Sequence, residues 1–193
     1  FGTFALRGLT SGQNNFSVNS YSGCEISTGS NNITIGEKAG SSMSTNSHSV
    51  FLGHYTGVET TGGCNIFIGA CAGRNVTSYD HNVQIGHSAG CVANNGYEVF
   101  IGFEAGKCMV GDSTVAIGRQ AMRGGSSGTS GNDAVAIGMY AGKDTTSAAG
   151  NVLIGRDAGS TTTTGGCNVA IGLYAGKCIL NQTNSVYIGA RAG

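Results

Sequence analysis

The chain has 193 residues, of which 35 are glycine and none is proline or tryptophan, and ten basic and ten acidic residues give a formal net charge of zero. The glycines lack the every-third-residue period of collagen, and the charge is too low for a highly charged disordered segment. No apolar run approaches the roughly 20 residues that span a bilayer. With zero net charge and no recognition motif, we also expect no nucleic-acid binding.

A short repeat occupies the whole sequence, and its clearest copy runs from Asn31 to Gly40. We define position 0 of each repeat as the Ile of the Ile-Gly step or its counterpart. In chain order, position 0 is Phe1, Val18, Ile35, Leu52, Ile68, Ile85, Ile101, Ile117, Ile137, Ile154, Ile171 and Ile188. The usual spacing of 16 or 17 residues predicts a stack of twelve similar coils.

Each repeat is expected to contribute one strand that ends at position 0. Position −2 is Val or Ile in ten of eleven copies, the exception being Phe16. Residues at −2 and 0 share one face of a strand, and β-branched side chains suit a buried pleated surface. We therefore expect this face to form the core of the coil.

Two glycines, at +1 and +5, bracket a segment that usually carries Ala at +4, as in Gly36 to Gly40. These glycines predict bends, and the Ala predicts a tight inner corner. The polar residues that follow, such as Thr161 to Gly166, are typical of an outer loop. The one long spacing, from Ile117 to Ile137, predicts that 124–131 protrudes as a widened coil.

Position −1 lies on the opposite strand face, and eight of its eleven residues are apolar. A solvated face would be mostly polar, so this face is expected to contact partner chains. The largest side chains of the predicted oligomer interface are Phe51, Phe67, Phe100, Leu153 and Tyr187.

The fold class that follows is all-β, a parallel β-solenoid or β-roll of twelve coils of about 17 residues each. Residues 1–193 form a single repeat region, and no capping segment is visible at either end of the sequence. Because stacked repeats need caps to stay soluble, we expect the chain to be a slice of a longer fibre.

The pattern Asn-x-Val-x-Ile-Gly-x-x-Ala-Gly is most complete in Asn168 to Gly176. It resembles the repeats of phage and virus tail-fibre proteins and is similar to the shorter repeats in the heads of trimeric autotransporter adhesins. The resemblance implies a homotrimer of parallel β-rolls, displayed on a virion or outside a cell and used for attachment. A structural shaft or head segment of such a fibre is the leading hypothesis for function.

Two clusters could carry additional chemistry. Cys91 and Cys108 lie at +6 and +7 of adjacent coils, close enough for an inter-coil disulfide, with free thiols as the alternative. Six basic residues at +6 would line up as a stripe that could contact anionic host-surface glycans, with a solvated turn as the alternative. They are Arg7, Arg74, Lys107, Arg123, Lys143 and Lys177.

No catalytic, metal or cofactor site is predicted. The seven cysteines include no Cys-x-x-Cys pair, and no two carboxylates recur in the facing arrangement that glycoside hydrolysis requires. The chain is therefore expected not to be an enzyme, and the competing hypothesis is a carbohydrate-processing β-solenoid tailspike.

Overall fold

The computed structural model describes residues 1–193 except 78, 94–95, 125–131, 148, 163 and 179–180. The described residues form eleven three-residue strands and no helix. The strands are β1 (Phe16–Val18), β2 (Ile33–Ile35), β3 (Val50–Leu52), β4 (Ile66–Ile68), β5 (Val83–Ile85), β6 (Val99–Ile101), β7 (Val115–Ile117), β8 (Val135–Ile137), β9 (Val152–Ile154), β10 (Val169–Ile171) and β11 (Val186–Ile188).

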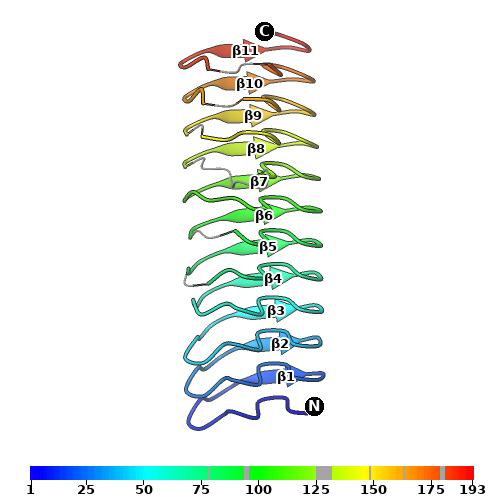
Figure 1. The fold of residues 1–193 in the computed structure, drawn as a ribbon, viewed down its shortest axis with the longest axis vertical. Coiled ribbons are helices and arrows are strands. Elements are labelled where there is room, and N and C mark those ends of the chain that lie inside the picture. Colours follow the sequence, from blue (N-terminus) through cyan, green and yellow to red (C-terminus); the bar gives the residue numbers. More distant parts are fainter. Residues whose placement is uncertain (78, 94–95, 125–131, 148, 163, 179–180) are drawn as a thin grey trace.

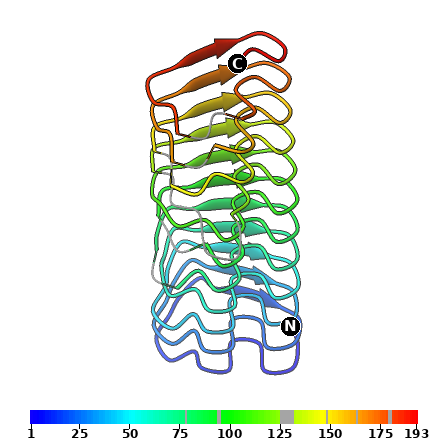
Figure 2. The same ribbon diagram turned by 45° about the horizontal axis from the view of Figure 1, so that its top comes forward.

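All eleven strands belong to one parallel sheet whose order follows the sequence from β1 to β11. Figure 1 shows the strands stacked as rungs along the long axis, and Figure 2 shows each coil returning through loops on the far side. The predicted all-β parallel solenoid with coils of about 17 residues is confirmed. The coil count of twelve is not confirmed: eleven strands are described, and of the strand positions −2 to 0 of the first repeat the sequence contains only Phe1.

The register is strict along the stack. Position 0 of each strand pairs with position 0 of the next, as in Ile85 with Ile101 and Ile101 with Ile117. The register passes unchanged across the long spacing, where Ile117 pairs with Ile137. The segment 125–131 lies outside the described residues, so the predicted protrusion of 124–131 stays a prediction.

The two strand faces are the reverse of those predicted. The middle residue of every strand, position −1, points into the coil and is buried from β1 to β10, whereas positions −2 and 0 are partly or fully exposed. The interior is narrow, so each strand contributes only one side chain to it. The alternation of a strand then turns the flanking Val and Ile outward.

The glycine at +5 makes room for this inward side chain. A Cβ added at Gly73 or Gly106 would lie 2.3 Å from the ring of Phe67 or Phe100 respectively. The glycine also adopts a positive φ, 59° at Gly73 and 61° at Gly106, which forms the predicted bend.

The interior is filled by complementary sizes at two positions of the repeat, −1 and +8. Where position −1 is small, as at Ser17 and Thr34, position +8 holds the buried Ile26 or Met43. Where position −1 is Phe51, position +8 is the buried Thr60. In these coils the exchange compensates for volume, as close packing requires. It does not extend to every coil, since Phe100 is accompanied by the large, buried Met109 and Ala136 by the small, buried Thr145.

Two ladders of polar side chains connect neighbouring coils in opposite directions. At position −3, the side-chain oxygen of Asn32 accepts the backbone N–H of Ser49 at 3.0 Å, and that of Asn65 accepts the N–H of Asn82 at 2.9 Å. At position −5 the direction reverses, since the N–H of Ser30 donates to Ser47 Oγ of the following coil at 3.0 Å. The buried amides thus replace water for backbone groups in the loops.

Candidate oligomerisation interface

One continuous apolar surface covers the strand side of the solenoid. We call it the outer face, and it consists of positions −2 and 0 of β1 to β11. All of these residues are Val, Ile or Leu except Phe16. The side chains are not marginally exposed: Ile33 and Ile66 expose 39% of their surface and Ile137 37%.

The outer face is large for a solvated surface. Three residues at about 3.3 Å each and ten rung spacings of about 4.8 Å give roughly 10 Å by 48 Å, on the order of 500 Å². The largest apolar patch on a typical monomer is about 300–600 Å² and is often functional. A specific interface buries about 800 Å² per partner, so this face and its rims are of interface size.

The residues predicted to form the oligomer interface lie elsewhere. Phe51, Phe67, Phe100 and Leu153 are fully buried within their own chain, and Tyr187 is partly buried against the core cluster that contains Phe100 and Leu153. Phe51 and Phe67 stack on each other with ring centroids 4.9 Å apart. The assignment of these five residues to an interface was wrong, because the coil interior already encloses them.

We call the inward-pointing residues at position −1 the inner row. In this row the side-chain amide of Gln84 lies between two phenyl rings. Gln84 pairs with Phe67 on one side and Phe100 on the other, and it is fully buried. Neither its Nε2 nor its Oε1 has a hydrogen-bond partner among the described residues. A buried amide without partners costs free energy, so Gln84 is a weak point of the core.

The predicted basic stripe exists as a column on the flank that follows the strands, which we call the basic flank (positions +2 to +6). All ten Lys and Arg residues of the chain lie there. Four of the six predicted residues lie over aromatic rings: Arg7 over Phe4, Arg74 over Tyr55, Lys143 over Tyr140 and Lys177 over Tyr174, at 4.9–5.4 Å from the centroid.

The other two residues of the stripe share one carboxylate. Lys107 Nζ lies 2.7 Å and Arg123 Nε 3.1 Å from Glu104, which also accepts a hydrogen bond from Gln120 Nε2 at 2.7 Å. The hydrogen bond from Lys107, helped by Gln120 and the charge of Arg123, lowers the pKa of the Glu104 carboxyl against the opposing effect of burial. Lys107 and Arg123 are therefore held at the surface by a structural ion cluster.

The opposite flank, where the loops lead into the strands, carries carboxylates and, at position −4, His48 and His81, but no Lys or Arg. No Lys or Arg occurs at positions −6 to −3 of any repeat, whereas Asp80, Asp112 and Asp133 lie there in nearby coils. We call this surface the acidic flank. Sequence reasoning missed the separation, although the column positions of the ten cations would have revealed it.

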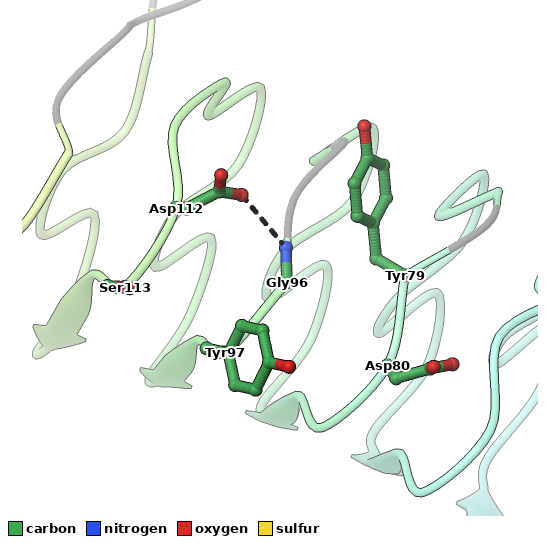
Figure 3. A pocket seen from close by; sticks show the side chains of 6 residues that line it. All are labelled: Tyr79, Asp80, Gly96, Tyr97, Asp112 and Ser113. Atoms are coloured by element: carbon green, nitrogen blue, oxygen red, sulfur yellow. Dashed lines mark hydrogen bonds between the residues drawn. The ribbon is translucent and has the colours of Figure 1, made fainter.

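The acidic flank contains a groove of about 450 Å³ lined by Tyr79, Asp80, Gly96, Tyr97, Asp112 and Ser113. Figure 3 shows the two tyrosines on either side of Gly96, with Asp112 reaching toward the Gly96 nitrogen. Both carboxylates are positioned by the backbone: Asp80 accepts the N–H of Gly63 at 2.6 Å and Asp112 that of Gly96 at 3.3 Å. The ring of Tyr97 stacks on His81 and is exposed.

The cysteines are free thiols. The N–H of Cys108 donates to the carbonyl oxygen of Cys91 at 3.0 Å, so the two residues are neighbours on adjacent coils as predicted, but no disulfide joins them. Burial raises the pKa of the Cys91 thiol, which lowers its reactivity.

The described part of the chain contains no group of three or more His, Cys, Asp and Glu residues that could hold a metal ion, and no helix able to cross a membrane. Comparison with known proteins adds no relative, since no family description, curated protein or solved structure matches the chain.

Proposed function

We propose that this chain is a structural segment of a fibrous attachment protein and assembles as a parallel homotrimer through its outer face. The observation that carries the proposal is the row of partly or fully exposed apolar residues, almost all Val and Ile, along all eleven strands. Removing apolar surface from water contributes roughly 25 cal/mol per Å² of favourable free energy. Burial of this row against another chain would therefore favour association.

A second copy of the same chain is the best occupant of this face. The face repeats about every 4.8 Å along a straight ladder, and another identical ladder offers apolar side chains at the same spacing. Cyclic assembly also closes the interface, whereas open side-by-side association would not. A trimer keeps all equivalent ends pointing in one direction and multiplies weak contacts with a host surface, which suits attachment.

The experiment compares the same substitution at two exposed apolar residues, of which the control residue is the more exposed. Ile137→Asp places a carboxylate on the outer face, where the residue is 37% exposed, and Val110→Asp places one on a loop residue that is 47% exposed. Sedimentation equilibrium should give three times the chain mass for the unmodified protein and for Val110→Asp, and a single folded chain for Ile137→Asp. A stable monomer of the unmodified chain would contradict the proposal.

A further inference from the structure

We infer that the two charged flanks pair between neighbouring copies of the chain, with the acidic groove of one copy receiving basic side chains, foremost Arg119, from the next. The inference rests on the proposed association through the outer face and specifies what lies at its two rims. It assigns a ligand to the groove in Figure 3, namely the guanidinium or ammonium groups of a second copy.

The first argument is topological. When copies rotate about an axis parallel to the solenoid, all strands run in the same sense around that axis. The loop that enters a strand in one copy then lies beside the loop that leaves the strand in its neighbour, at the same level of the stack. The acidic flank therefore meets the basic flank. A two-fold axis along the strands would instead place each flank against its own kind.

The second argument is the distribution of charge. The groove has two carboxylates, Asp80 and Asp112, and an exposed tyrosine ring at Tyr97, whereas no Lys or Arg of the chain occurs in that column. Carboxylates together with a tyrosine face favour a cation. The hydrogen bonds to Gly63 and Gly96 use one oxygen of each carboxylate and fix its position, which leaves the second oxygen for the incoming group.

The third argument is that Arg119 is exposed and forms no ion pair within the described part of its own chain. Arg119 lies at +2, directly after the strand, and its side chain is exposed. Its guanidinium lies 6.0 Å from the ring centroid of Phe103 and 5.8 Å from that of Tyr140, so rings of neighbouring coils position it. No carboxylate of the described residues forms an ion pair with it, whereas Arg156 at the same repeat position pairs with Asp157. Arg119 is thus available for a second chain at the level of the groove.

The first test removes charge and keeps hydrogen-bonding capacity. In Asp80→Asn/Asp112→Asn, the side-chain oxygens can still accept the N–H groups of Gly63 and Gly96, so the fold should be retained. We expect the dissociation concentration of the assembly, measured by sedimentation in about 50 mM NaCl, to rise roughly tenfold, in line with exposed charge pairs in several copies. The control is Asp144→Asn, which neutralises an exposed carboxylate outside the groove. This variant should leave the dissociation concentration unchanged.

The second test exchanges the charges. Arg119→Glu alone should weaken assembly, and Arg119→Glu/Asp112→Lys in one chain should restore it, because every neighbour contact again joins opposite charges. Failure of the restoration, or equal dissociation of the Asp80→Asn/Asp112→Asn variant and its control, would overturn the flank pairing. That result is distinguishable from failure of the outer-face association, which the Ile137→Asp comparison tests separately.

Discussion

The inner and outer faces of the same strands differ in an instructive way. The inner row changes from Ser17 through Phe67 to Ala170, yet these residues are buried throughout. The outer face holds almost only Val and Ile, yet it is partly or fully exposed in the single chain. Inside the coil, position +8 compensates for the volume of the inward residue in the coils of Ser17, Thr34 and Phe51. Outside, no second residue of the same coil can compensate, and the uniform side-chain size there is what the proposed association through this face would require.

The strongest test of the difference between the two faces is to truncate one residue of each face. Phe67→Ala should lower the free energy of unfolding by about 3–5 kcal/mol, because it opens a cavity in the inner row. Ile68→Ala, on the outer face of the same strand, should leave the folded single chain nearly unchanged and weaken association. Denaturant titrations in the dissociated Ile137→Asp background isolate the first effect. Equal losses there would contradict the assignment of the two faces.

Replacing the buried amide of Gln84 in the inner row should stabilise the folded chain. Gln84→Met removes an unpartnered buried amide and keeps a similar volume between Phe67 and Phe100, so we expect stabilisation by about 1–3 kcal/mol. The control is Gln120→Met, which loses the 2.7 Å hydrogen bond to Glu104 and should destabilise. Thermal unfolding of both variants checks the sign, and a loss at Gln84 would show that its amide has a partner in solution.

Acid should weaken the ion cluster on the basic flank. The pKa of Glu104 is lowered in the folded chain, mainly by Lys107, so its contribution is present above the unfolded value and is lost as pH falls through the folded value. The effect should be within about 1 kcal/mol, as for other partly exposed pairs. Unfolding measured from pH 7 down to pH 3 should show a smaller decline for Glu104→Gln. Parallel curves would exclude the cluster as a source of pH dependence.

The smallest expected effect concerns the thiols. Because Cys91 is part-buried with a raised pKa, alkylation should be slower there than at the exposed Cys64 and Cys167. Mass mapping of unreduced protein should recover Cys91 and Cys108 as separate alkylated thiols. Recovery of the two as one linked peptide would restore the disulfide hypothesis.

The sequence predicted where the strands lie and how they align, because a fixed step between glycines admits only one register. It did not predict which strand face is inside. Alternation separates two faces but cannot orient them when both are apolar, and here Val99 and Phe100 are equally credible core residues. The size variation at −1 and the glycine at +5 were the available signals. The groove at Tyr97 and Asp112 joins residues of different coils, so only the stacked geometry brings it together.

The opposed polar ladders have a consequence for how such a solenoid can change in length. Each coil is tied only to the coil before and the coil after it, through the same pair of positions, as at Ser30 with Ser47 and Asn32 with Ser49. Duplication of the coil that begins at Ser30 would therefore meet matching donors and acceptors at the new junction, because Ser30 and Ser47 carry the same hydroxyl. The length of the solenoid can therefore change in steps of about 4.8 Å, one coil at a time, while the core of the neighbouring coils stays as it is.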